Sequence, residues 1–226
     1  MFKVANLFDL SQTAHAALFV SDGPAWEALP HIKDYLAETL KPAILATVSP
    51  QAIVGENVSI GEGTIVAAGA CIEGPAIIGR NCQIRHNAYI RAEVIVGDNC
   101  VVGNACELKN ALLFNDCQVP HFNYVGDSLL GHHAHLGAGV VLSNFKSLPG
   151  NVTVQHGDDK IDTGLRKFGA LIGDHTEIGC NSVLNPGSIV GRGSVIYPNI
   201  NWRGVLAAGH IVKNAASREV IAKLEG

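Results

Sequence analysis

The feature that most restricts how this chain can fold is an apolar residue that recurs at every sixth position. The series stays in phase over much of the first half of the chain: Val48, Val54, Ile60, Val66, Ile72, Ile78, Ile84, Ile90, Val96, Val102, Leu108 and Phe114. A small or β-branched residue, such as Ala70, Cys82 or Val94, stands two positions before each member from position 54 to position 102. A period of six fits neither an amphipathic helix nor a single two-sided strand. It fits a short strand followed by a corner, with one large and one small side chain pointing inward.

Three such repeats are enough to close a triangular coil of 18 residues. Six extended residues cover roughly 20 Å at a rise of about 3.3 Å per residue, less what the corner takes up. Successive coils would then stack as parallel strands, and each coil would bury the apolar side chains of its neighbour. The sequence therefore predicts a mainly β protein, a single-stranded parallel β-helix over residues 47–213. The spacing does not indicate its handedness.

The rhythm shifts by one residue between Phe114 and Val119, just before Pro120. Further shifts separate Val125 from Leu130, and the series resumes after residue 170. The small residue Cys117 still precedes Val119 by two positions, so we expect the coil to continue through the shift. The missing residue is predicted to fall at a corner between positions 114 and 119.

Residues 1–46 do not follow the period and are predicted to form a helical cap. Positions 24 to about 40 carry a helical apolar stripe, with Ser21 or Asp22 near its start and Pro42 beyond its end. An open first coil would expose unpaired backbone groups, so we expect this helix to cover it.

Two further segments depart from the period. Residues 143–169 interrupt the repeats with a long polar insertion, in which Val152, Val154 and Ile161 could form a small hairpin. A loop this long inside a compact repeat protein is usually functional or mobile. Residues 214–226 are predicted to form a C-terminal helix.

Composition excludes several classes of protein. Charged residues make up 16% of the chain, the net charge is −4, and no run of Lys and Arg suggests a nucleic-acid partner. No run of about 18 apolar residues suggests a membrane span, and the N-terminus lacks the features of a secretory signal. Four of the six cysteines occupy small core positions and none forms a C-x-x-C pair, which favours reduced thiols, a cytoplasmic location and no structural zinc.

A pair of cations marks one side of the predicted coils. Arg91 and Lys109 are 18 positions apart, so their side chains would stack on successive coils. Stacked cations repel each other unless an anion lies between them, and phosphate or carboxylate is the group that Arg and Lys bind well. The alternative is a solvated face on which Glu93 and Glu107 act as counter-ions. Spacing alone leaves both interpretations open.

A histidine lies beside the shifted corner. His121 comes two positions after the inward Val119, so its side chain is expected to point outward at a corner. We expect the shift to turn His121 and Tyr124 toward a cleft whose wall carries Arg91 and Lys109. An imidazole with a pKa near 6.5 is suited to accepting a proton at neutral pH.

The segment HFNYVGDSLLGHHAHLGAGVVLSNFK, which begins at His121, carries a more specific signal. It resembles the acetyltransferase domain of the bifunctional N-acetylglucosamine-1-phosphate uridylyltransferase/glucosamine-1-phosphate acetyltransferase family. The resemblance runs without a gap over residues 91–146 and resumes from Lys167 to about residue 198. It implies a left-handed β-helix and a homotrimer with active sites between neighbouring prisms. The uridylyltransferase half has no counterpart in these 226 residues.

The resemblance also implies roles for individual residues. His121 matches the general base that takes a proton from the substrate amine. The sugar phosphate would be bound by Arg91, Lys109, Tyr124 and Lys167. Asn144 matches a residue at the sugar and acetyl end of the site, and Ala138 matches one beside acetyl-CoA. The amine, once deprotonated, could attack the thioester directly, without an acyl-enzyme.

Three positions depart from the family pattern. His135 replaces an asparagine that contacts the sugar, Phe145 replaces a tyrosine and lacks its hydroxyl, and Cys180 replaces a serine near the coenzyme. We retain His135 as a substrate-binding candidate and Phe145 and Cys180 as coenzyme-binding candidates. The insertion between Lys146 and Lys167 is also much longer than in the family.

Two other functions compete with this interpretation. The histidines at 121, 132, 133, 135 and 156 suggest a zinc β-helix protein like the trimeric carbonic anhydrases, which bind zinc through three histidines at subunit boundaries. The pair of histidines five residues apart that marks those enzymes is missing here, so we expect no metal. The other alternative is a non-catalytic assembly subunit. We predict an acetyl-CoA-dependent N-acyltransferase that acts on a phosphorylated amino sugar.

Overall fold

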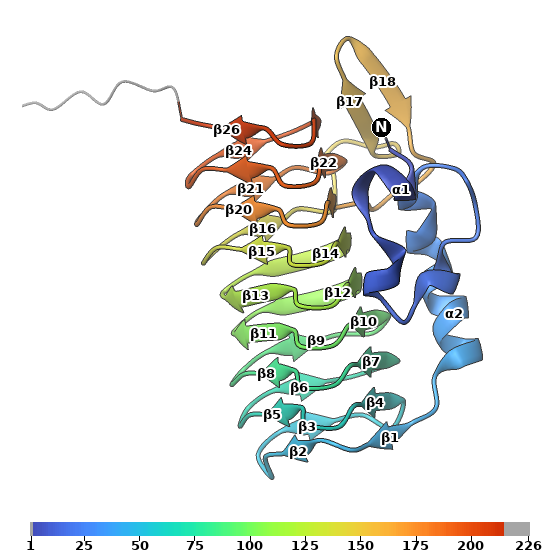
Figure 1. Ribbon diagram of the computed structural model, residues 1–226, viewed down its shortest axis with the longest axis vertical. Coiled ribbons are helices and arrows are strands. Elements are labelled where there is room, and N and C mark those ends of the chain that lie inside the picture. Colours follow the sequence, from blue (N-terminus) through green and yellow to red (C-terminus); the bar gives the residue numbers. More distant parts are fainter. Residues whose placement is uncertain (1, 215–226) are drawn as a thin grey trace, which may run out of the picture.

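The computed structural model describes residues 2–214, and most of them form a parallel β-helix with three faces (Figure 1). The first face is a ladder of nine parallel strands: β2 (Thr47–Val48), β5 (Ile65–Val66), β8 (Gln83–Ile84), β11 (Val101–Asn104), β13 (Gln118–His121), β15 (His135–Leu136), β20 (Glu177–Ile178), β23 (Val195–Ile196) and β26 (Ile211–Val212). The predicted fold class is therefore confirmed.

The other two faces share two long strands. The second face consists of β3 (Ile53–Val54), β6 (Cys71–Ile72), β9 (Tyr89–Ile90), β16 (Val141–Leu142), β21 (Val183–Leu184) and β24 (Asn201–Trp202). The third consists of β1 (Ala43–Ile44), β4 (Val58–Ile60), β7 (Ala76–Ile78), β10 (Val94–Val96), β19 (Ala170–Ile172), β22 (Ser188–Val190) and β25 (Val205–Leu206). Strands β12 (Glu107–Leu113) and β14 (Tyr124–Leu130) run around the corner and belong to both faces. The β-helix thus begins at Ala43, a few residues before the predicted boundary.

The six-residue series fills the interior, as its spacing predicts. Its members from Ile60 to Leu108 are buried, and so are the small partners, including Cys82, Cys100, Cys106 and Cys117. Burial raises the pKa of the Cys100 and Cys106 thiols, which keeps both of them neutral.

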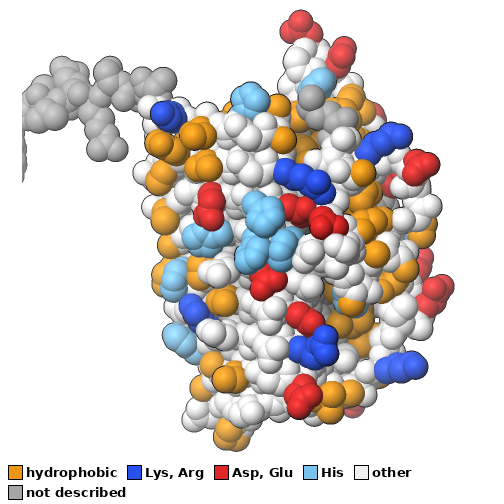
Figure 2. All heavy atoms as spheres, in the orientation of Figure 1, with side chains coloured by type: hydrophobic (Ala, Val, Ile, Leu, Met, Phe, Trp, Pro, Cys, Tyr) orange, Lys and Arg blue, Asp and Glu red, His pale blue; other side chains and the backbone are white. Residues whose placement is uncertain are grey.

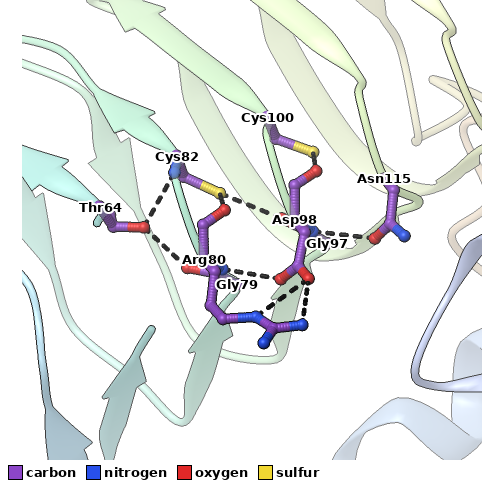
Figure 3. A network of polar contacts seen from close by, with 8 residues as sticks. All are labelled: Thr64, Gly79, Arg80, Cys82, Gly97, Asp98, Cys100 and Asn115. Atoms are coloured by element: carbon purple, nitrogen blue, oxygen red, sulfur yellow. Dashed lines mark hydrogen bonds and ion pairs between the residues drawn. The ribbon is translucent and has the colours of Figure 1, made fainter. Parts of the chain in front are cut away.

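The small inward side chains also bind the backbone of the next corner (Figure 3). The Thr64 hydroxyl donates to the carbonyl of Gly79 at 2.8 Å, and the Cys82 thiol donates to the carbonyl of Gly97 at 3.1 Å. Residues with a short polar side chain therefore satisfy corner carbonyls that would otherwise be buried without a donor.

The shift in the rhythm lies at a different place from the one predicted. Leu113, not Phe114, pairs with Val96 and points inward, so the missing residue falls at the corner after Leu108. Phe114 points outward, where its ring centroid lies 5.1 Å from that of Phe8. The prediction was wrong because both residues are apolar and both are buried, and periodicity cannot distinguish an inner apolar surface from an outer one.

The N-terminal segment contains α1 (Val4–Leu7), η1 (Leu10–Gln12), η2 (Ala16–Leu18), η3 (Ala25–His31) and α2 (Ile32–Thr39). The predicted helix is therefore present, as a 3₁₀ helix that continues into an α-helix. The prediction that it caps the first coil is wrong, because the segment lies along the third face beside the middle coils (Figure 1).

The reason is an apolar stripe on the outer side of the third face. Its members are stacked on successive coils and all are buried: Ile95, Leu112, Leu129, Leu171 and Ile189. Leu29, Ile32 and Leu36 of the N-terminal segment pack against this stripe. The third face is thus buried on both sides, like the sheets of other parallel-strand proteins, and the segment supplies the second layer.

The insertion at residues 143–169 contains the predicted hairpin, β17 (Thr153–His156) paired antiparallel with β18 (Asp159–Asp162). Val152, just before the hairpin, and Val154, within β17, are buried in the same outer cluster as the N-terminal segment. The predicted C-terminal helix falls almost wholly on residues 215–226, which lie outside the described residues. Among residues 2–214, no helix has the length and hydropathy that crossing a membrane requires.

We expect the Ile32→Ala variant to lose about 2–5 kcal/mol of unfolding free energy in urea titrations, because the side chain is fully buried against the third face. Glu38→Ala, on the exposed side of the same helix, should change it by less than about 0.5 kcal/mol. Equal effects of the two substitutions would show that the segment does not pack as described.

Candidate functional site

The corner between the first and second faces brings three of the predicted site residues into one column. In this column the Phe122 N–H donates to the carbonyl of Asn104, the Gly139 N–H to that of His121, and the Asn181 N–H to that of Ala138. The residues just before these donors occupy the same corner position on consecutive coils: His121, Ala138 and Cys180. The insertion hides this relation in the sequence, since it separates the second and third members by an additional hairpin.

A buried asparagine holds the corner of His121 in place. The main-chain N–H of His121 donates to Oδ1 of Asn123 at 3.0 Å, and Nδ2 of Asn123 donates to the carbonyl of Gly137 at 2.7 Å. Asn123 is 2% exposed, whereas the His121 side chain is exposed. Sequence reasoning missed Asn123, although an asparagine two positions before the inward Val125, where other repeats carry a small residue, is a readable signal.

The second face carries the polar residues predicted to hold the sugar phosphate. Nη1 of Arg91 donates to Oε1 of Glu107 at 3.0 Å, and this hydrogen bond raises the pKa of the guanidinium. Tyr124 lies beside Glu107 on the next coil. Burial, and then the charge of Glu107, raise the pKa of the Tyr124 hydroxyl, so it stays protonated and can donate a hydrogen bond.

A glycine makes room for two of these side chains. A Cβ atom on Gly126 would stand 2.6 Å from both the Tyr124 hydroxyl oxygen and Nδ2 of Asn144. Those two polar groups therefore lie together over the backbone of Gly126, which has no side chain to exclude them.

The Asp127 carboxylate contacts three side chains at the corner between the second and third faces. Its carboxylate accepts hydrogen bonds from Nδ2 of Asn110 at 2.9 Å and from Nδ2 of Asn144, and it lies 3.4 Å from Nζ of Lys109. Only 5% of the side chain is exposed. Each of the two stacked cations therefore has a carboxylate of its own chain, Glu107 for Arg91 and Asp127 for Lys109. Glu107 is one of the counter-ions that the solvated-face interpretation named, and Asp127 was missed.

The two ends of the insertion reach the edge of this face. Phe145 pairs with Lys167 through the backbone, and the guanidinium of Arg166 lies 4.7 Å from the centroid of the Phe145 ring. Phe145 also lines a pocket of about 330 Å³ together with Lys146 and Arg203, which gives that pocket a positive rim.

His135 lies apart from these residues within one chain. It belongs to the first face, where its Nδ1 forms a 2.6 Å hydrogen bond with Oε2 of Glu177. The predicted site residues other than His135 thus lie on the second face, at its two corners or at the ends of the insertion, whereas His135 lies on the first face.

Asp127→Asn is expected to cost about 1.5–3 kcal/mol of unfolding free energy, because both carboxylate oxygens accept from amide donors and an asparagine NH₂ would face one of them. Asp98→Asn is the matched control, since Asp98 also pairs with a cation at a corner (Figure 3), but 32% of its side chain is exposed. It should cost less than about 1 kcal/mol in the same urea titration. A loss for Asp98→Asn as large as that for Asp127→Asn would refute the buried role of Asp127.

Residues 72–159 match the family model described as the GMPPB C-terminal domain. The bifunctional sugar-1-phosphate nucleotidylyltransferase/acetyltransferase of Sulfurisphaera tokodaii is 34% identical over 90 residues, which is 40% of this chain and 22% of that protein. The bifunctional protein GlmU of Prochlorococcus marinus is 36% identical over 98 residues, 41% of this chain and 18% of that protein. The matched part thus spans about a fifth of the length of these relatives.

Among solved structures, the UDP-N-acetylglucosamine acyltransferase from Campylobacter jejuni is similar, with a TM-score of 0.39, 17% identity and coverage of 71% of this chain and 69% of that one. Scores and identities of this size carry no information about the site. The chain is thus a six-residue-repeat parallel β-helix that is similar, over about 40% of its length, to the bifunctional nucleotidyltransferase/acetyltransferases.

Proposed function

We propose that the protein transfers an acetyl group from acetyl-CoA to the amine of a phosphorylated amino sugar. One observation carries the proposal: a single corner stacks His121, Ala138 and Cys180 on consecutive coils, beside a face that presents Arg91 and Tyr124. In this proposal the corner supplies the base and, at Ala138 and Cys180, small residues for a thioester arm, and the face that borders it supplies donors for an anionic sugar.

The proposed reaction needs one proton acceptor and no covalent intermediate. The imidazole of His121 takes a proton from the substrate ammonium, and the free amine attacks the thioester carbonyl carbon. The C–S bond then breaks, the protonated imidazole gives its proton to the leaving thiolate of the coenzyme, and the new amide nitrogen releases its second proton to solvent. The pKa values of Cys100 and Cys106 are raised by burial, so these thiols are unsuited to act as nucleophiles.

The cations differ in how they could take part in sugar-phosphate binding. The Arg91 side chain is 38% exposed and shares one nitrogen with Glu107, which leaves further N–H groups for a phosphate. Lys167 is exposed at the end of the insertion. Lys109 is held by Asp127, which also holds Asn144, so in this proposal Lys109 orients Asn144 as well as adding positive charge.

A homotrimer with sites between neighbouring prisms is part of the proposal. Large apolar side chains such as Ile65 on the first face and Phe122 at its corner are exposed, and a neighbouring prism would cover them. In such an assembly His135 on the first face of one subunit could approach the second face of the next. A cytoplasmic location, inferred from the reduced cysteines, belongs to the same proposal.

A non-catalytic assembly subunit is the second candidate. The ion pairs of Arg91 with Glu107 and of Lys109 with Asp127 favour it, because a face that neutralises its own cations does not require an anionic ligand.

An assay of acetyl transfer to glucosamine 1-phosphate, monitored through the release of free coenzyme thiol, distinguishes the two candidate functions. We expect turnover by the wild type and a fall in kcat of at least about 100-fold in His121→Ala, the loss that follows removal of a general base. His86→Ala is the matched control, since His86 occupies the same corner column two coils earlier and is also exposed. Its kcat should be unchanged. Equal inactivity of wild type and His121→Ala toward a panel of amino-sugar phosphates would favour the assembly subunit.

Alkylation of Cys180 tests where the coenzyme binds. Cys180 is exposed, whereas Cys82, Cys100, Cys106 and Cys117 are buried, so iodoacetamide should modify Cys180 first in the native protein. Acetyl-CoA should slow this modification severalfold, as followed by peptide mass spectrometry, and should leave the slower labelling of Cys71 unchanged. Unslowed modification of Cys180 in a protein that does turn over acetyl-CoA would show that the coenzyme binds elsewhere.

A further inference from the structure

The fold separates the histidines that lie close together in the sequence. His121 lies at the corner described above, His135 bonds to Glu177, and the ring of His156 packs edge-on against Phe2. His132 and His133 lie at a different corner, between the third and first faces. A group of histidine side chains gathers near the middle of one face of the molecule, with carboxylates next to it (Figure 2).

This second corner repeats one backbone geometry on every coil. Its central residue has a positive φ: Gly63, Asn81, Asn99, Asp116, His133, His175, Gly193 and Gly209. Glycine and asparagine are the usual residues in this conformation. Three consecutive coils instead carry Asp116 (φ 63°), His133 (φ 55°) and His175 (φ 56°). Asp and His also tolerate this conformation, and at this corner they place metal-binding side chains on three adjacent coils.

Side chains of the first two of these coils lie close enough to share one ion, and a histidine of the third lies beside them. One nitrogen or carboxylate oxygen from each of Asp116, His132 and His133 lies within 4.8 Å of the other two. The ring centroids of His132 and His133 are 4.3 Å apart, and that of His175 lies 5.3 Å from His132 and 5.4 Å from His133.

The surrounding groups orient His132. Its Nδ1 lies 3.0 Å from the carbonyl oxygen of Asn115 and 3.5 Å from Oδ2 of Asp116, which favours the tautomer with the proton on Nδ1 and leaves the lone pair on Nε2. Its main-chain N–H donates to Oδ1 of Asp174 at 2.9 Å. Asp174 is 3% exposed and is balanced by Arg192 at 3.2 Å. A histidine whose second nitrogen is fixed by a carbonyl is the arrangement that proteins use for metal ligands.

We propose, in place of the expectation of no metal drawn from the histidine spacing, that this corner binds one divalent transition-metal ion of the zinc class. Asp116, His132 and His133 are three ligands, and a rotation of the neighbouring His175 side chain would supply the fourth. Imidazole with carboxylate is a donor set that suits Zn²⁺, Co²⁺ and Ni²⁺. Donor atoms in a tetrahedral site with bonds of about 2.0–2.1 Å stand about 3.4 Å apart, so small rotations of surface side chains close the site.

The ion would cross-link consecutive coils at one corner. Asp116, His133 and His175 belong to successive coils, and Asp174 on the third coil also accepts the main-chain N–H of Asp9 at 2.7 Å. The site is therefore connected to the N-terminal segment. Binding should stabilise the folded state, because these ligands are brought together only in the native stack. Its ligands are separate from the acetyl-transfer residues, so either proposal can fail alone.

The experiment is a zinc titration of metal-free protein that carries no affinity tag, monitored by calorimetry. We expect one Zn²⁺ per chain and a rise in Tm that EDTA reverses. Cobalt in place of zinc should give the intense visible absorption of a tetrahedral site.

His133→Asn and Asp116→Asn are the test variants, because the same corner already holds asparagine at Asn81 and Asn99 and the fold should tolerate it. Each should weaken zinc binding by at least about 100-fold, since loss of even an indirect partner of a metal site commonly costs 10- to 100-fold. Their Tm without metal should match the wild type, and His86→Ala should bind zinc normally. Absence of zinc binding by the wild type, or undiminished binding by both variants, would overturn the proposal.

Discussion

The hydrogen bonding between successive parallel coils is the constraint on which the rest of the structure depends. Each coil forms its backbone hydrogen bonds with the coils before and after it, so equivalent residues stack about 4.8 Å apart along the whole β-helix. The interior must therefore hold the same side-chain volume in every layer, which is why one large and one small residue alternate. The corners must also repeat, which requires a left-handed backbone conformation at the same position of successive coils.

Because equivalent positions of successive coils stack, residues far apart in the sequence form columns of side chains. The residues of both proposed sites lie in such columns. Residues 17 or more positions apart become direct neighbours, as with His121 and Ala138 or with Asp116 and His133. A column holds its members at a fixed spacing without any contribution from loop structure. The two corners that border the first face therefore carry two separate sets of groups, one proposed for acetyl transfer and the other for a metal ion.

Much of the fold could be predicted from the sequence, because the six-residue period reports directly on the interior. The insertion hairpin and the helical N-terminal segment were predicted for the same reason, as departures from that period. The position of the shift was not, because Leu113 and Phe114 are both apolar and face two different buried surfaces. The acceptor role of Asp127 was also missed, because Asn110 and Asn144 each lie 17 positions from it and align with it only once the corner is known to be one residue short.

The N-terminal segment has a consequence for how copies of this chain can associate. It occupies the third face along the middle coils, so among the described residues two faces of the prism are left uncovered there. A closed ring with threefold symmetry needs two different contact surfaces on each subunit, one for each neighbour. The edge shared by the two uncovered faces is the one that carries His121. By covering one side of a three-sided rod, the segment restricts any ring to an arrangement in which that edge points toward the shared axis or toward a boundary between subunits.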